Sequence, residues 1–186
     1  MPPFGRAIPC MFVNGAASAQ LGRNLTSFRV HAVDGRASVQ VALLSPVGMI
    51  ADLNTDDVES NRLDIHLHED EEFFSGTLTA LVTRLPLDGQ QRTVLRARGV
   101  VPEDAAGASI ALRFGQNISS GSVRREGGRC ILRARCNVLE LRPNSRIDVL
   151  TGDPAFDGPF RVTQLRYRLD AGTGMTVEFN AEAERA

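Results

Sequence analysis

Apolar and polar residues alternate along much of the chain with a period of two. Over residues 175–183 every odd position is apolar and every even position is polar, which predicts a strand with one buried face. The same rule, with apolar or β-branched residues between turn formers, predicts six more strands, over residues 37–41, 63–67, 93–97, 109–113, 130–134 and 160–165. Helical periodicity is nearly absent, so the pattern predicts a mostly β protein.

Glycine-containing pairs separate these segments. Asn14-Gly15, Asp34-Gly35, Asp88-Gly89 and Gly127-Gly128 can adopt the positive φ angles of tight turns. A sheet of about five to seven short strands leaves exposed edges, and curling into a small barrel removes them. We therefore expect small β-barrels.

The chain also repeats itself around one motif. Arg62-Leu-Asp64-Ile returns as Arg146-Ile-Asp148-Val, and a Phe-x-Gly follows each copy, at 74–76 and at 156–158. Further echoes keep the same order: Gly-x-Asn-x-x-Ser-x-x-Val at 22–30 and 115–123, Gly-Arg at 35–36 and 128–129, Leu-x-x-Arg-Leu at 81–85 and 165–169, and Thr-Val at 93–94 and 176–177. We infer two copies of one module of roughly ninety residues.

We place the first β-barrel module at residues 1–100 and the second at residues 101–186. The boundary falls near Pro102, where small residues interrupt the strand pattern. Residues 45–57 have no counterpart of equal length in the second copy, so we expect a loop or short helix inserted in the first module only. Because Asp64 and Asp148 are repeated, we expect them to serve the fold rather than to form a catalytic pair.

Composition narrows the class of protein. Hydrophobic residues make up 42% of the 186 residues, yet no run approaches the ~20 apolar residues that cross a bilayer, so we expect a soluble protein with no membrane partner. The N-terminus lacks the apolar region of a signal peptide. With 21 basic and 22 acidic residues, the chain has no overall field to recruit nucleic acid. Cys10, Cys130 and Cys136 form no C-x-x-C and are expected to be reduced and structural.

One segment has the residue types of a metal site. His66 and His68 lie two apart on a predicted strand, so both rings should face the same side, and four acidic residues follow at 69–72. The spacing supplies no third ligand, and the second module has Leu150-Thr-Gly-Asp153 in this place. We expect a solvated acidic hairpin tip, with a divalent-metal site as the alternative.

Motifs of catalysis are missing. No G-x-S-x-G occurs, His31 has no nucleophile beside it, and phosphate loops and Rossmann fingerprints are absent. Cys130 and Cys136 lie in or beside apolar strand segments, so they are expected in the core. We therefore expect no enzymatic activity, no cofactor, and no catalytic, cofactor-binding or metal-binding residues.

Arginines recur at spacing two in three predicted strands. The pairs Arg96/Arg98, Arg133/Arg135 and Arg166/Arg168 each place positive charge on one face. Glu178 and Glu182 form an acidic stripe, so we expect ion pairs with arginines within the chain or across an interface. With no Trp and one Tyr the chain lacks stacking platforms, so we expect no sequence-specific nucleic acid.

The duplicated β modules, the Phe-x-Gly followed by two strands in each copy, and the segment 141–179 together resemble the phage late control D family. These are the tail hub proteins of contractile phages and related injection machines, including the N-terminal part of VgrG-type spikes. In that family a last strand of the form g-x-T-x-x-F closes the second barrel, and Gly174-Met-Thr-Val-Glu-Phe179 follows this form.

The resemblance implies a structural hub or adaptor that forms a homotrimer. Two similar barrels per subunit would make a pseudo-sixfold ring, which joins the tail tube protein on one side to a spike protein on the other. It also implies a place in a virion or injection particle that is assembled in the bacterial cytoplasm. Family members are typically longer and carry extra domains, so this chain would be a minimal hub that needs a separate spike protein.

Two alternatives stay open. A small-molecule-binding β-barrel protein would have a concave apolar pocket with a few polar groups. A metal-dependent enzyme would use His66 and His68 as ligands, and would bind zinc through them.

Overall fold

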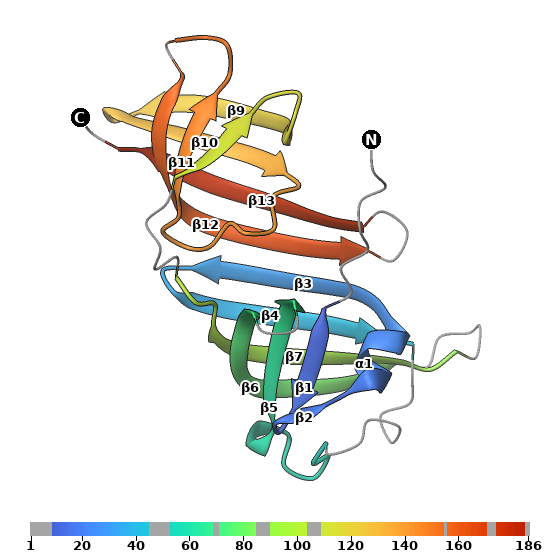
Figure 1. Ribbon diagram of the computed structural model, residues 1–186. Helices are drawn as coiled ribbons and strands as arrows, with labels where there is room; N and C mark the ends of the chain where they lie inside the picture. Colours follow the sequence, from blue (N-terminus) through green and yellow to red (C-terminus); the bar gives the residue numbers. More distant parts are fainter. Residues whose placement is uncertain are drawn as a thin grey trace. The chain divides into compact units, whose positions relative to one another are not determined.

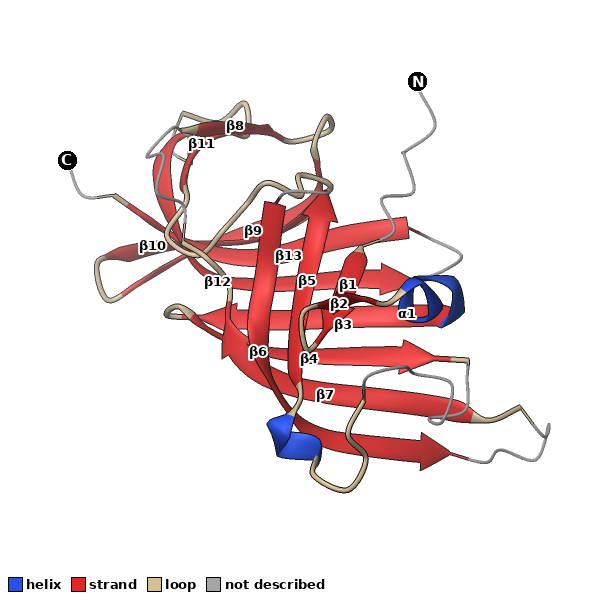
Figure 2. Cartoon of the chain, turned by 60° about the horizontal axis from the view of Figure 1, so that its bottom comes forward, coloured by secondary structure: helices blue, strands red, loops and turns tan. Residues whose placement is uncertain are grey.

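The computed structural model describes residues 9–44, 53–68, 71–84, 90–103, 109–154, 156–170 and 174–184, apart from the side chains of His68 and Asp170. This part of the chain is mostly β, as predicted (Figures 1 and 2). The first strands are β1 (Cys10–Val13), β2 (Ala16–Ala17), β3 (Leu25–Val33), β4 (Arg36–Leu43), β5 (Arg62–His68), β6 (Glu71–Arg84) and β7 (Arg92–Val100). The others are β8 (Ile110–Arg113), β9 (Ile118–Glu126), β10 (Arg129–Cys136), β11 (Arg146–Leu150), β12 (Gly158–Asp170) and β13 (Gly174–Ala183).

Two short helices accompany the strands, α1 (Ala19–Asn24) and the 3-10 helix η2 (Val58–Ser60). Ser18 caps α1 by accepting a hydrogen bond from the Leu21 N–H at 3.4 Å, and the Leu21 side chain is fully buried. Among the described residues, no helix has the length and apolar character needed to cross a membrane.

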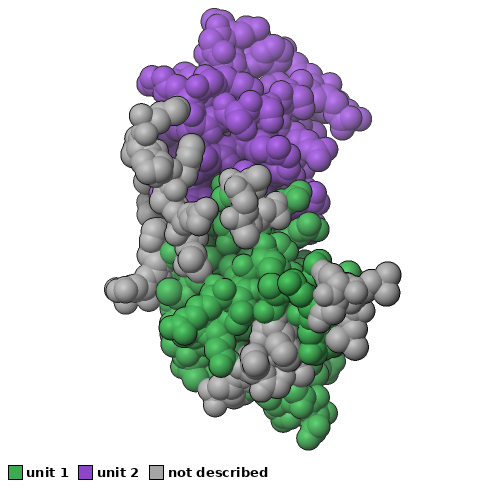
Figure 3. Space-filling model, turned by 90° about the vertical axis from the view of Figure 1, so that its right-hand side faces the viewer, with its two compact units in different colours: residues 1–30, 36–101, 168–175 green, residues 31–35, 102–167, 176–186 purple. Residues whose placement is uncertain are grey.

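The chain divides into two compact units (Figure 3). Unit 1 comprises residues 1–30, 36–101 and 168–175, and unit 2 comprises residues 31–35, 102–167 and 176–186. The modules 1–100 and 101–186 stay a prediction.

Strand β6 turns unit 1 into two crossing layers. Its residues 71–77 pair with β5, which pairs with β1, and its residues 75–84 pair with β7, which pairs with β4. All four pairings are antiparallel. In Figures 1 and 2, β1 and β5 cross the strands β3, β4 and β7, and the 14-residue β6 belongs to both sets. One long strand shared by two layers lets their apolar faces meet.

The core of unit 1 lies between these layers. Phe28 from β3 and Phe73 from β6 are both fully buried, and their ring centroids are 6.1 Å apart in a tilted arrangement. Leu63, Leu78 and Leu95 are also fully buried. Burial of each such side chain stabilises the fold by about 1.5–3 kcal/mol.

Unit 2 repeats the strand order of unit 1. Unit 1 contains the path β1-β5-β6-β7-β4-β3, and unit 2 contains β8-β11-β12-β13-β10-β9, so each strand has a counterpart in chain order. The first pair differs in direction, because β1 is antiparallel to β5 whereas β8 is parallel to β11. Closure of either unit into a barrel stays a prediction.

The ladder registers show which sequence echoes are structural. Asp64 lies opposite Ser75 and Asp148 lies opposite Pro159, so Ser75 corresponds to Pro159. Gly76 then corresponds to Phe160 and not to Gly158. The two Phe-x-Gly sequences, at 74–76 and 156–158, therefore do not occupy equivalent positions in the two units.

The two glycines of that echo also serve different needs. A Cβ at Gly76 would lie 2.4 Å from the Arg98 carbonyl oxygen, whereas Gly158 has a φ of +141° and open space around it. One position requires close approach of two backbones, and the other requires a dihedral angle that L residues avoid.

The Thr-Val echo is displaced as well. β4 and β10 each have eight residues and each follow a two-residue turn, so Leu43 corresponds to Cys136. Leu43 lies opposite Thr93, and Cys136 lies opposite Val177. Thr93 therefore corresponds to Val177 and not to Thr176. A shift of one residue places a side chain on the other face of the sheet, so this difference matters.

All seven strands predicted from alternation are present, within β4, β5, β7, β8, β10, β12 and β13. Three of the four predicted turns have positive φ at both residues: Asn14-Gly15, Asp34-Gly35 and Gly127-Gly128. Asp88-Gly89 lies outside the described residues, as does 45–52 of the insertion predicted at 45–57. The alternation did not predict the described strands β1, β2, β3, β6, β9 and β11; of these, β9 is an edge strand whose residues are mostly polar and exposed.

Candidate interaction surfaces

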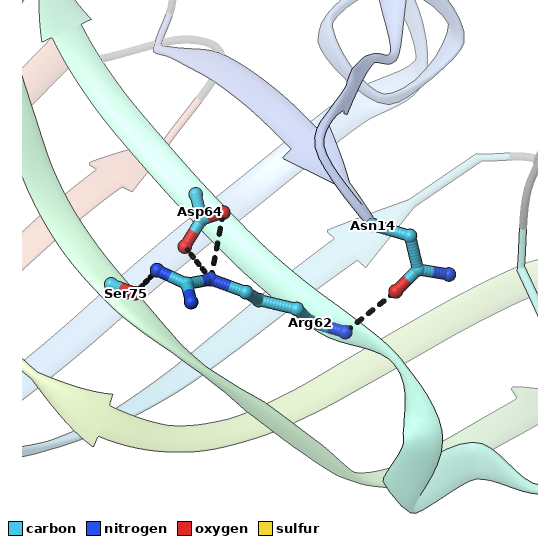
Figure 4. Close-up of polar contacts among 4 residues, drawn as sticks. All are labelled: Asn14, Arg62, Asp64 and Ser75. Carbon is cyan, nitrogen blue, oxygen red and sulfur yellow. Dashed lines mark hydrogen bonds and ion pairs between the residues drawn. The ribbon is translucent and has the colours of Figure 1, made fainter.

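The repeated Arg-x-Asp motif forms a polar cluster at the start of β5 (Figure 4). The Arg62 Nε donates to both oxygens of Asp64, at 2.9 and 3.1 Å, and an Arg62 terminal nitrogen donates to Ser75 Oγ at 2.7 Å. The Arg62 backbone N–H donates to Asn14 Oδ1 at 2.8 Å. The hydrogen bond with Asp64 is the main cause that raises the pKa of Arg62. These contacts tie β5 to β6 and to the turn after β1.

The same motif has different partners in unit 2. Arg146 forms an ion pair with Glu184 at 3.0 Å, and Asp148 accepts a hydrogen bond from Ser109 Oγ at 2.6 Å. The position of Ser75 is taken by Pro159, which has no hydroxyl to offer. Asp64 and Asp148 thus each serve local strand contacts, in agreement with the expectation that the repeat reflects fold.

Unit 2 carries a charged face made of Arg129, Arg133, Arg135, Arg166, Glu178 and Glu182. Arg135 binds Glu178 at 2.6 Å, Arg166 lies 3.8 Å from the same carboxylate, and Arg129 lies 3.7 Å from Glu182. The predicted pairing of arginine stripes with the acidic stripe of β13 is therefore confirmed within the chain. The opposite sides of β10 and β13 bury Leu132 and Phe179 in the core of unit 2.

The charged face holds Glu178 ionised. The hydrogen bond from Arg135 is the main cause that lowers the pKa of Glu178, and the charges of Arg135, Arg166 and Arg133 add to it against partial burial. A hollow of about 230 Å³ lies here, lined by Arg133, Gln164, Arg166, Glu178, Phe179 and Asn180. Sequence reasoning missed this hollow, because its lining comes from three strands.

Unit 1 carries the third arginine pair without acidic partners. Arg96 and Arg98 are exposed on β7, opposite Gln40 and Ser38 of β4. Within the described residues neither arginine has an ion pair. Gln40 of β4 and Arg133 of β10 are at the same position in their eight-residue strands. Gln40 lies opposite Arg96 and Arg133 lies opposite Asn180, so Arg96 corresponds to Asn180. The exposed faces of the two units therefore differ in charge pattern despite their common strand order.

The predicted metal segment forms a hairpin. His66 lies opposite Glu72 and His68 opposite Glu71, and the acidic residues 69–70 of the predicted hairpin tip lie outside the described residues. The His66 ring contacts the Phe12 ring in a tilted arrangement, with centroids 4.7 Å apart. In the part of the chain that the structure describes, no three His, Cys, Asp or Glu side chains gather as metal ligands would.

The cysteines and His31 also have defined environments. Cys136 is buried, Cys130 is half-buried, and Cys10 is exposed. Burial raises the pKa of the Cys136 thiol to about 11, so the thiol stays protonated at neutral pH. His31 lies in β3 and its Nε2 is 2.5 Å from Gln164 Nε2.

Strand β9 is the outer strand of unit 2. It pairs with β10 along its length and has no second strand beside it among the described residues. Residues 119–122 are all exposed, and no proline interrupts the strand. An edge of this kind presents unpaired backbone N–H and C=O groups, which a further strand can bind.

Comparison with known proteins identifies the fold. No family model and no curated protein matches the chain. Among solved structures, a tail protein from Neisseria meningitidis MC58 matches with a TM-score of 0.69 and 8% identity, over 95% of this chain and 96% of that one. The 43 kDa tail protein of prophage MuSo2 from Shewanella oneidensis matches with a TM-score of 0.64 and 6% identity, over 93% of this chain and 95% of that one.

A third match is the E. coli c3393 protein, a component of the type VI secretion system with structural similarity to the T4 bacteriophage tail proteins gp27 and gp5. Its TM-score is 0.66 at 10% identity, over 95% of this chain and 77% of that one. At such identities the likeness is one of fold. The chain thus has the fold of phage tail proteins and of a tail-like component of a secretion system.

Proposed function

We propose that the chain is a structural hub or adaptor of a phage tail or of a tail-like contractile injection system, of the late control D type. In this proposal three copies form a ring with pseudo-sixfold symmetry, which joins the tail tube protein to a spike protein. The ring belongs to the tail or baseplate of a particle assembled in the bacterial cytoplasm. The role depends on shape and interfaces and not on catalysis.

The observation that carries the proposal is the repeated strand order, taken with the fold shared with tail proteins. A ring of three chains presents six similar surfaces only when each chain contributes two of them. The paths β5-β6-β7-β4-β3 and β11-β12-β13-β10-β9 are two such surfaces within one chain.

The β9 edge supports a contact between copies. Closed rings are built from heterologous contacts, in which one surface of a subunit meets a different surface of the next. An edge strand with residues 119–122 exposed is a ready partner for such a contact, because soluble proteins otherwise blunt long edges. We therefore assign the β9 edge to the contact between neighbouring copies.

The interior of unit 1 favours this role over the small-molecule alternative. A ligand barrel needs a concave apolar pocket. The inward positions of unit 1 are filled by large side chains such as Phe28, Phe73 and Phe74, each fully buried. Among the described residues, a hollow of about 230 Å³ on unit 2 is lined mainly by polar and charged residues, and one of about 440 Å³ has Arg129, Glu182 and Glu184 in its wall.

Light scattering after size exclusion tests the proposal. We expect a trimer, alone or on mixing with the tube protein of the same gene cluster. Ser122→Lys places a charge on the β9 edge and is expected to prevent trimer formation without unfolding the chain. Ser38→Lys is the matched control, since Ser38 is an exposed serine on the inner strand β4. A strict monomer in the presence of the tube protein would overturn the proposal.

A further inference from the structure

The contact proposed at the β9 edge does not use the hollow on the charged face of unit 2. Its walls come from β10, β12 and β13, and the charged members are Arg133, Arg166 and Glu178. Of the three, Glu178 is already engaged, at 2.6 Å from Arg135 outside the hollow. The positive charge of Arg133 has no ion-pair partner among the described residues, and Arg166 reaches Glu178 only at 3.8 Å.

One of the two amide oxygens in the hollow is already engaged. Gln164 Oε1 accepts a hydrogen bond from Asn180 Nδ2 at 2.7 Å. Both guanidinium groups are exposed, which leaves their N–H donors accessible. Two accessible guanidinium groups beside a small hollow are suited to bind a carboxylate through charge-assisted hydrogen bonds.

Unit 1 lacks this arrangement at the corresponding positions. Gln40 corresponds to Arg133, and Val82 and Val94 correspond to Arg166 and Glu178 by the same registers. Val94 is 6% exposed and Arg96 stands in the place of Asn180, so the equivalent spot on unit 1 has one arginine and no acidic residue. The charged hollow therefore breaks the equivalence of the two units.

We infer that the hollow between Arg133 and Arg166 is a docking site for a glutamate or aspartate side chain of a partner protein. This inference rests on the proposed function for its geometry, because a ring of three chains would present the site three times among six similar surfaces. The partner is then an acidic segment of a protein with threefold symmetry.

The lining favours a protein carboxylate over a nucleic-acid phosphate. Glu178 forms part of the wall, and a nucleic-acid strand brings a continuous row of singly charged phosphates past this carboxylate, whereas a protein side chain brings a single carboxylate. Phe179 is 2% exposed, so the hollow has no aromatic surface on which a base can stack. The volume of about 230 Å³ suits a single side chain.

A titration of the isotope-labelled full chain, followed by backbone amide chemical shifts, tests the inference. The probe is a hexaglutamate peptide, with a hexaglutamine peptide and a short DNA duplex as comparison ligands. We expect saturable shifts at Arg133, Gln164, Arg166 and Asn180 with hexaglutamate alone, weakening as salt is added. Arg133→Glu/Arg166→Glu is expected to weaken binding by about tenfold or more.

Arg96→Glu/Arg98→Glu is the matched control, because it makes the same change of net charge on unit 1. It should leave the affinity unchanged. Equal affinity of wild type and Arg133→Glu/Arg166→Glu, equal binding of hexaglutamine, or shifts at the hollow with DNA would each overturn the inference. Light scattering on the same samples separates the two proposals, since a trimer that does not bind hexaglutamate removes only the docking site.

Discussion

Asn14 Nδ2 donates a hydrogen bond to Asn61 Oδ1 at 3.1 Å, although 47 positions separate the two residues in the chain. Asn61 is fully buried, and its oxygen also accepts from the Asn54 N–H at 2.7 Å. The contact joins the turn after β1, the loop before η2 and the start of β5. Ser145 holds the corresponding place before β11 and is buried to the same extent, with its Oγ accepting from the Arg142 N–H.

Asn61→Leu should therefore destabilise the chain. Asn61 Nδ2 donates to the carbonyl oxygens of Asn54, Asp57 and Val58, and an isosteric apolar side chain leaves them without this donor. We expect the free energy of unfolding to fall by about 2–4 kcal/mol, measured by urea denaturation. Asn24→Leu is the control, because its hydrogen bond to the Gln20 carbonyl is exposed and its loss should cost below about 1 kcal/mol. Equal losses would argue against the buried network.

Gly99→Ala tests the close approach of β6 and β7. A Cβ at Gly99 would lie 2.0 Å from the Ser75 carbonyl oxygen and 2.5 Å from the Gly76 Cα. We expect a loss of about 3 kcal/mol or more, because backbone atoms cannot move aside as a flexible side chain can. Gly115→Ala should cost only about 1–2 kcal/mol, since its φ of +77° is unfavourable for Ala but the surrounding space is open. The midpoint of urea unfolding reports both, and a larger loss for Gly115 would contradict the steric account.

Glu178 should contribute a small, pH-dependent stability. Its pKa in the folded chain is lowered, mainly by the hydrogen bond from Arg135, so its contribution is present above the carboxyl pKa of the unfolded chain. That contribution is lost as the pH falls through the lowered pKa of the folded chain. Because the pair is largely solvent-exposed, we expect Glu178→Gln to cost below about 1 kcal/mol at neutral pH and nothing at strongly acidic pH.

Side-chain NMR titration checks the cause of this shift. In Arg135→Gln the pKa of Glu178 should move back toward its ordinary value. An unchanged pKa in that variant would show that Arg135 is not the main cause.

The thiols should differ in reactivity. Burial raises the pKa of Cys136 to about 11, so almost no thiolate is present at pH 8 and the native chain should protect this residue from maleimide or disulfide reagents. Cys10 is exposed and should be labelled in the native state. Mass spectrometry of peptides labelled before and after denaturation gives the result, and rapid native labelling of Cys136 would contradict its place in the core.

Local pattern was enough to predict seven of the described strands and three of the turns. Alternation over residues such as 63–67 and 130–134 reflects burial of one face, and Asp34-Gly35 and Gly127-Gly128 favour positive φ whatever surrounds them. The arginine stripes and their acidic partners were also predictable, because residues two apart on a strand share a face. The duplication was visible for the same reason, since it preserves these local patterns.

The register between strands was decided only by tertiary structure. Side chains of β5 and β6 select their neighbours through contacts across the ladder, and nothing in the local pattern distinguishes Gly158 from Phe160 as the counterpart of Gly76. The different partners of Arg62 and Arg146 follow from that register. So does the hollow between Arg133 and Arg166, because β10 must lie beside β13, which follows β12 in the chain, before the two guanidinium groups can share one space.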